Sequence, residues 1–381
     1  MAENVHRNLW LALAIVGALV LVATAFSDGI TDPDTWWHLA AGKYITENRS
    51  VPHTDPFSWT AAGKSWITHE WLTEALFFLV YAAGHFWGLL LLLLGSTFAL
   101  LVLYWRLLCN AGSPFFVSLL LLLFTGEMLY PFLELRPQVI SYLLFVAFLY
   151  LLDRYERGEN RLYILPPLTA LWANCHGSFF LGPFLLLLTL CCGLLPPQEG
   201  RLTNRRLAAK ETVRLWSLFL LSTAAILLNP NGSALLTYPF STIGAGDMVN
   251  HIQEWLSPDF HNPYNQLFFL YFTGTFLVLL LTPYTIRLFD LTLFLLFGAA
   301  AFTHARLLAY AVIVNGLLWA RYWRPSFRFR LPVRAHYPFM VGLALLYCAA
   351  LFLKAPPQNP VDYRFTNARE FPVKALAYLK D

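Results

Sequence analysis

The sequence predicts an all-α fold, a polytopic transmembrane helix bundle, and its composition and its long apolar stretches both point to that class. Of the 381 residues, 58% are hydrophobic and 13% are charged, and the mean hydropathy is +0.55. A soluble domain carries about 25% charged residues, so this chain is too apolar for that class. The net charge of +4 is small, and its basic residues lie in short clusters, which excludes nucleic acid as the expected partner.

Apolar windows recur at lengths close to the roughly 20 helical residues that cross a hydrocarbon layer. The first window resembles a signal peptide, but its length favours a retained span. We predict about eleven spans within a transmembrane domain over residues 1–353. They cover residues 8–27, 87–108, 115–132, 137–152, 162–175, 178–195, 214–229, 266–283, 288–303, 305–320 and 336–353.

The distribution of basic residues predicts the orientation. With the N-terminus in the cytoplasm, sixteen of the 26 Lys and Arg residues fall on the cytoplasmic side, as the positive-inside rule requires. Eight of the ten histidines then fall outside. An odd number of spans places the C-terminus outside as well. The tail over residues 354–381 begins with a Pro-rich linker and then a short helical pattern, which predicts the start of a further soluble domain.

The first extracytoplasmic loop, residues 28–86, is too patterned to be a simple connection. Apolar residues recur at helical spacing after Trp36 and again after Trp71, which predicts two amphipathic helices at the membrane interface. Between them, Pro52, Pro56 and Gly63 mark a tight loop. The five cysteines lie mostly in apolar runs without CxxC spacing, so we interpret them as packing residues.

Asp32, Asp34 and His38 follow the first span directly. Charged groups within reach of the bilayer cost several kcal/mol unless they are paired or hydrated, so such clusters are functional hypotheses by default. The sequence therefore predicts a catalytic cluster at this membrane exit.

These residues resemble a known family. The layout of one span, an Asp-containing motif and two juxtamembrane helices is similar to the GT-C superfamily of membrane glycosyltransferases, which includes oligosaccharyltransferases, protein mannosyltransferases and the aminoarabinose transferase of lipid A. Asp32-Pro33 is similar to the Asp-Pro of oligosaccharyltransferase catalytic subunits, and Asp34-Thr35-Trp36-Trp37-His38-Leu39, Asp55-Pro56-Phe57-Ser58 and His69-Glu70-Trp71-Leu72 are typical of prokaryotic polytopic members assigned loosely to GT-C. The resemblance implies an enzyme of a prokaryotic inner membrane. Such an enzyme transfers a sugar from a polyprenyl-phosphate carrier to a glycan, lipid or protein acceptor.

Inverting transfer of a sugar needs a carboxylate that takes the proton of the acceptor hydroxyl. Asp32 and Asp34 are the candidates, and we expect Asp32 to be the base. Asp34 precedes the helix that opens with Trp36-Trp37-His38, and Asp is a favoured N-cap. Capping is therefore the alternative role of Asp34.

The departing phosphate needs donors on the same face, and arginine suits phosphate oxygens. Arg136 lies at an outer helix boundary before Pro137, and Arg306 lies in an outside hairpin. An arginine that only meets lipid headgroups is the alternative for each. Further polar residues predicted on this side as substrate-binding candidates are His69, Glu70, His176, His251, Glu254 and His304.

A metal ion is a further option. His69-Glu70 begins like a zinc-protease motif, but Thr73 occupies the position of its second histidine. Asp32 and Asp34 are possible oxygen ligands of Mg²⁺ or Mn²⁺, with Glu70 or Glu254 added.

Two other function classes fit a membrane cavity with ionisable groups. A transporter or lipid flippase usually has internal repeats and broken helices near the midplane, and the sequence shows no such repeat. A non-catalytic protein that only binds a lipid-linked sugar is the other alternative.

Overall fold

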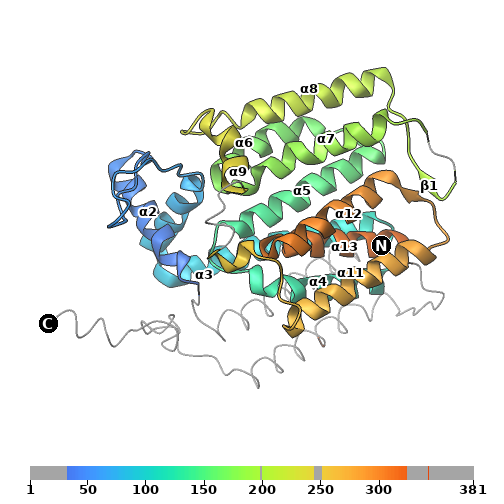
Figure 1. Ribbon diagram of the computed structural model, residues 1–381, viewed down its shortest axis with the longest axis horizontal. Helices are drawn as coiled ribbons and strands as arrows, with labels where there is room; N and C mark the ends of the chain where they lie inside the picture. Colours follow the sequence, from blue (N-terminus) through green and yellow to red (C-terminus); the bar gives the residue numbers. More distant parts are fainter. Residues whose placement is uncertain (1–31, 198–199, 244–250, 324–341, 343–381) are drawn as a thin grey trace, which may run out of the picture.

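The structure is a computed structural model that describes residues 32–197, 200–243 and 251–323, with residue 342. The described chain is mostly helical, and its long helices run roughly side by side in one bundle (Figure 1). The α-helices are α2 (Asp34–Asn48), α3 (Trp71–Asn110), α4 (Phe115–Leu129), α5 (Gln138–Glu156), α6 (Leu165–Cys175), α7 (Leu181–Leu194), α8 (Ala209–Ala225), α9 (Ala234–Ile243), α11 (Pro263–Leu281), α12 (Leu288–Thr303) and α13 (Leu308–Tyr322).

Short elements join these helices. The 3₁₀ helices are η1 (Tyr130–Phe132), η2 (Leu162–Ile164), η3 (Gly177–Phe180), η4 (Gln253–Trp255) and η5 (Ala305–Leu307). Two two-residue strands, β1 (Leu202–Thr203) and β2 (Ile286–Arg287), pair in parallel, with Leu202 opposite Ile286 and Thr203 opposite Arg287.

Five helical segments among the described residues are long and apolar enough to cross a membrane: 71–110, 115–132, 138–156, 177–194 and 263–281. Their outward faces are apolar, as in α11, where Leu270 and Leu281 are 64% and 76% exposed. Contiguous exposed apolar surface of this kind is unusual on a soluble monomer. The protein is therefore membrane-embedded.

The predicted spans that fall on described residues coincide with helices, because apolar run length is the strongest local signal of a span. The windows 8–27 and 336–353 and the tail 354–381 lie outside the described residues. Several of the other windows form helices shorter than a full span, such as α6 with 11 residues. The count of eleven spans stays a prediction.

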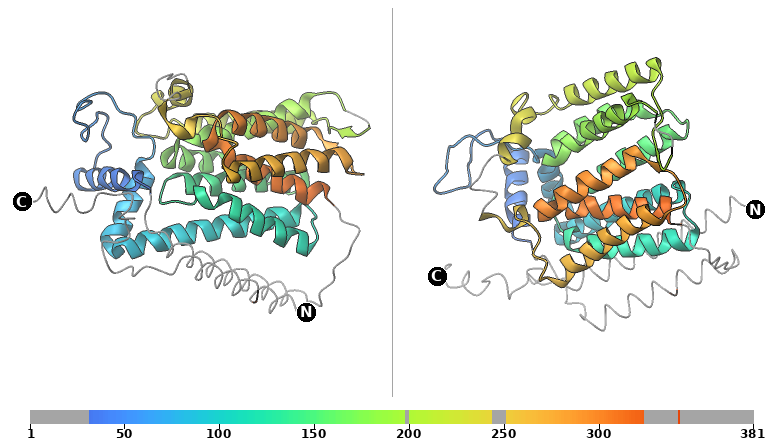
Figure 2. Two further views of the ribbon diagram at one scale, coloured as in Figure 1. Left: turned by 60° about the horizontal axis from the view of Figure 1, so that its bottom comes forward. Right: turned by 45° about the vertical axis from the view of Figure 1, so that its right-hand side comes forward.

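Helix α13 lies at the centre of the bundle, where it packs against α11, α12 and α4. Almost all its side chains from Leu308 to Tyr322 are buried. Helices α3 and α5 also contact it, whereas α2 lies across one end of the bundle (Figure 2).

The first loop contains both predicted helices, α2 and the part of α3 that precedes His85. The segment that begins at Trp71 continues as α3 to Asn110, with a sharp bend at His85 where φ is 50° and ψ is −144°. Figure 2 shows α3 turning there from the end of the bundle into its long axis. The first part of α3 packs against α2, and Gly42 permits this contact, because a Cβ there would lie 1.9 Å from the carbonyl oxygen of Glu74.

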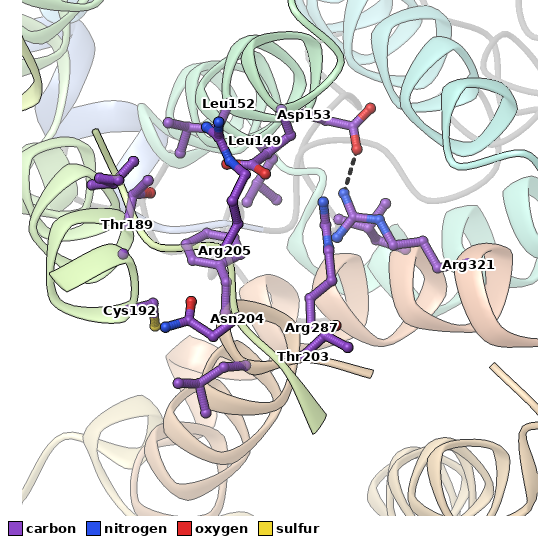
Figure 3. A pocket seen from close by; sticks show the side chains of 16 residues that line it. Leu149, Leu152, Asp153, Thr189, Cys192, Thr203, Asn204, Arg205, Arg287 and Arg321 are labelled. Atoms are coloured by element: carbon purple, nitrogen blue, oxygen red, sulfur yellow. Dashed lines mark hydrogen bonds and ion pairs between the residues drawn. The ribbon is translucent and has the colours of Figure 1, made fainter. Parts of the chain in front are cut away.

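At the opposite end of the bundle, a cavity of about 390 Å³ lies between α5, α7, α12 and α13. Figure 3 shows Arg205, Arg287 and Arg321 on its wall, with Arg321 paired to Asp153. Each of these arginines has a carboxylate partner: Arg205 pairs with Glu211, Arg287 with Asp290, and Arg321 with both Asp153 and Asp290. We interpret this end as a structural ionic network.

Candidate functional site

The polar residues predicted on the outer face converge at the end of the bundle that carries α2. They come from α2, the start of α3, the turn before α5, the α6–η3 junction, η4 and η5, and this end lies on the left in Figure 1. The chain returns to it after each pair of antiparallel helices. Site residues that lie more than 100 positions apart in the sequence are therefore in contact, as Arg136 is with Asp32 and with Glu254.

Arg136 is the centre of the first group of side chains. Its Nε donates to Oδ2 of Asp32 and its Nη2 to Oδ1, both at 2.6 Å. The Asp32 side chain is only 2% exposed, and its Oδ1 also accepts from the backbone N–H of Asp34 at 3.1 Å. Both oxygens of Asp32 thus accept hydrogen bonds from Arg136.

Three more carboxylates surround the same guanidinium. Asp34 lies 3.1 Å from Nη2, Glu254 accepts from Nη1 at 3.3 Å, and Glu134 lies 3.7 Å from Nε. These bonds outweigh burial and hold the pKa of Arg136 above its usual range. Burial and then the Asp32 charge raise the pKa of Glu134 to about 7.

This arrangement changes three sequence-based interpretations. Arg136 is fully engaged by carboxylates, so a donor phosphate would have to displace one of them. Asp32 presents no free oxygen for a shared metal with Asp34. The prediction that Asp34 caps the helix is wrong, because α2 begins at Asp34 and Asp32 accepts its N–H.

The second group lies one helical turn further along α2. Nδ1 of His38 lies 3.2 Å from Oε1 of Glu74 and 3.8 Å from Oε2 of Glu70. All three residues are buried, and one ligand atom from each falls within 4.8 Å of the others. This group could hold a metal ion, and it is the only such group found among the described residues.

His69 and His176 complete the second group around Glu70. Each places its Nε2 3.4 Å from Oε1 of Glu70. Burial lowers the pKa of His176 to about 3, so this ring is neutral. Burial acts in the same direction on His69, but the adjacent Glu70 carboxylate outweighs it and raises the pKa. Burial of Glu70 opposes its ionisation, yet the histidines, His69 first, hold its pKa well below the usual range.

Arg306 differs from Arg136 in its surroundings. Its guanidinium lies over the ring of Trp255 at 4.3 Å, a distance typical of a cation–π contact. His304 also contacts Trp255, because its Nδ1 lies 2.7 Å from the carbonyl oxygen of that residue. Within residues 32–197, 200–243 and 251–323, Arg306 forms no ion pair with a carboxylate. Its charge nevertheless lies close enough to contribute to the low pKa of His176.

Three predicted residues are not members of the two groups: His304 and Arg306, which lie beside Trp255, and His251. His251 is exposed at the start of the segment that leads to η4. All the other predicted site residues, catalytic and substrate-binding, lie in the two groups or beside Trp255.

Several members of the site were not predicted from the sequence. Glu74 follows Glu70 by four residues on one face of an apolar helix, a spacing that could have identified it. Ser141 and Ser178 contact Nδ1 of His176 at 2.8 Å each. They carry no sequence signal, because each is a lone serine near the start of an apolar span.

No model of a known protein family matches the chain, and no curated protein matches it in sequence.

Proposed function

We propose that the protein is a membrane glycosyltransferase of GT-C type that transfers a sugar from a polyprenyl phosphate to an extracytoplasmic hydroxyl. The observation that carries this proposal is Arg306, an arginine without a carboxylate partner among the described residues, held over Trp255 beside a group of carboxylates. Glu254 and Trp255 are adjacent in η4 and connect Arg306 to Arg136 and Asp34. A phosphate site and a candidate base therefore occur side by side.

Asp34 is the stronger candidate for the general base, and this revises the order expected from the sequence. Its side chain is 40% exposed and makes a single contact with Arg136 at 3.1 Å, whereas Asp32 is held by two bonds to the same arginine. In the proposed reaction, the oxygen of the acceptor hydroxyl attacks the anomeric carbon of the sugar. Asp34 takes the proton of that hydroxyl at the same time. The bond from that carbon to the phosphate oxygen breaks with inversion, and polyprenyl phosphate leaves with the electron pair.

Arg306 has the chemistry to hold that leaving group. A guanidinium binds phosphate oxygens in bidentate geometry, and the ring of Trp255 restricts its orientation. Trp255 also offers an apolar surface on which the first isoprene units can lie.

The test is binding of undecaprenyl phosphate, with undecaprenol as the matched lipid without charge. We expect the purified chain in nanodiscs to bind the phosphate and not the alcohol. Arg306→Ala should weaken binding of the phosphate roughly 10- to 150-fold, because hydrogen bonds to charged groups contribute about 1.5–3 kcal/mol. Arg205→Ala, at the far end of the bundle, is the control.

Transfer itself is measured with undecaprenyl-phosphate-linked glucose and mannose that carry a radiolabel. Membrane lipids and glycans are present as acceptors, and the measured quantity is the release of undecaprenyl phosphate. Equal binding of both lipids, or binding that Arg306→Ala leaves intact, would contradict the phosphate site. Binding of the phosphate without transfer of any sugar offered would favour a protein that only binds the carrier.

We also propose that the protein is multi-pass in a prokaryotic plasma membrane, with its N-terminus in the cytoplasm and this site outside. Supporting this orientation, Arg205, Arg287 and Arg321 gather at the end opposite the site. In a cysteine-free background, Thr60→Cys should react with a membrane-impermeant maleimide in intact cells, whereas Arg206→Cys should react only after lysis. The reverse pattern would invert the assignment.

A further inference from the structure

In the group formed by His38, Glu70 and Glu74, the described residues supply fewer hydrogen-bond donors than the carboxylate oxygens require. Oε2 of Glu74 is fully buried and has no hydrogen-bond partner among the residues that the structure describes, and Glu74 is 1% exposed. An unpaired carboxylate oxygen in such surroundings is costly. It therefore points to a cation that the described part of the chain does not supply.

The side chains around Glu70 leave one of its two oxygens for the ligand group. Nδ1 of His176 accepts from the N–H of Ser178 at 3.2 Å, so its Nε2 carries the proton and faces Oε1 of Glu70 at 3.4 Å. Nδ1 of His69 lies 3.2 Å from the carbonyl oxygen of Ile67 and must donate to it. Nε2 of His69 lies 3.4 Å from the same Oε1. Two imidazoles therefore face Oε1 of Glu70, and its Oε2 lies 3.8 Å from Nδ1 of His38, inside the ligand group.

We propose that His38, Glu70 and Glu74 bind a divalent first-row transition metal ion such as Zn²⁺ or Mn²⁺, with His69 beside it. Imidazole with carboxylates suits Zn²⁺ and its neighbours, whereas Mg²⁺ and Ca²⁺ take oxygen ligands alone. Metal–ligand bonds of about 2.1 Å place the ligand atoms of a tetrahedral site about 3.4 Å apart. His38 lies 3.2 and 3.8 Å from the two carboxylates, so only small movements are needed.

Neighbouring groups hold the ligands in place, as they do in most metal sites. His176 fixes Glu70 from the far side, and Ser141 and Ser178 fix His176. Gly42 brings α2 against the backbone of Glu74. These contacts leave the ligand atoms preorganised.

The site does not depend on sugar transfer, so its test is metal content. The full chain, purified in detergent and stripped with chelator, is incubated with chlorides of Zn²⁺, Mn²⁺ or Fe²⁺, desalted, and measured by inductively coupled plasma mass spectrometry. We expect about one ion per chain for at least one of these metals. His38→Gln and Glu74→Gln should weaken binding by more than the 10- to 100-fold that loss of an outer partner costs.

Two control variants distinguish this site from metal binding at surface carboxylates and from binding at the Arg136 group. Glu47→Gln changes an exposed carboxylate on the same helix, and Asp34→Asn removes a carboxylate of the Arg136 group; both should retain the metal. Co²⁺ added to the wild-type chain should give the visible absorption of a coordinated ion, a readout that needs no variant to fold. A wild-type chain that holds none of the four metals, or a folded Glu74→Gln chain with wild-type content, would overturn the proposal and leave protons as the cations of this group.

Discussion

Asp32 and Asp34 are two residues apart, yet Arg136 gives them different environments. Asp32 is buried and accepts three hydrogen bonds, from Arg136 twice and from the N–H of Asp34. Asp34 keeps one oxygen toward solvent because it makes a single contact at 3.1 Å. The more buried carboxylate therefore supports the structure, and the more exposed one is available for proton transfer.

Substitution by asparagine should separate these roles. Asp34→Asn should lower the rate of sugar transfer by about 10²- to 10⁴-fold, the range for loss of a general base, with stability unchanged. Asp32→Asn should instead lower stability by about 3–5 kcal/mol, because it leaves the Arg136 charge without its main partner. Transfer assays and thermal unfolding in detergent measure the two effects. An Asp32→Asn chain that is stable but inactive would restore Asp32 as the base.

Glu134 makes the stability of this group dependent on pH. Its pKa rises from the usual 4.5 to about 7 in the folded chain, so the native state holds a proton that the unfolded state has lost. Stability therefore falls as pH rises from about 4.5 to about 7, and changes no further above that. Glu134→Gln should unfold at a higher temperature than the wild type, with a difference that grows across this window. A difference that is constant from pH 4.5 to 8 would contradict the raised pKa.

At the scale of elements, the packing of α2 on α3 aligns His38 with Glu74. Gly42→Ala would place a methyl group 1.9 Å from the carbonyl oxygen of Glu74, and overpacking of this kind typically costs about 1–3 kcal/mol. We expect a lower unfolding temperature and weaker metal retention together.

Gly84→Ala is the matched control, because no atom lies within 4 Å of its added Cβ. It should leave the unfolding temperature and the metal retention close to those of the wild type. Equal effects of the two substitutions would exclude the close approach at Gly42.

Elements were easier to predict from the sequence than contacts between them. The apolar windows 115–132 and 288–303 match helical segments of the structure, since each needs only its own residues to signal it. The break at His85 directly follows Gly84 and lies between the predicted helix after Trp71 and the predicted span 87–108, so local sequence also indicated this boundary. The pairing of Arg136 with Asp32, 104 residues apart, depends on how the bundle assembles, and one sequence gives no direct signal of that.

For the whole molecule, the ionic network at the far end joins three helices. Arg321, with a side chain 9% exposed, pairs with Asp153 on α5 and Asp290 on α12. Arg321→Ala should lower the free energy of unfolding by about 3–5 kcal/mol, because it leaves buried carboxylates short of a partner. Arg205→Ala, which removes a more exposed pair, should change it by less than about 1 kcal/mol. Equilibrium unfolding in a denaturing detergent compares them, and similar losses would contradict a stabilising network.

The same network bears on the order in which the chain is made. Asp153 pairs with Arg157 one turn away, and Asp290 pairs with Arg287 in the same way. Each carboxylate therefore leaves the ribosome together with an arginine that neutralises it within its own segment. Arg321 is synthesised 168 residues after Asp153 and has no acidic residue of its own within one turn. The early helices can thus remain in the membrane without an uncompensated charge, and the last described helix closes the bundle by joining two pairs that already exist.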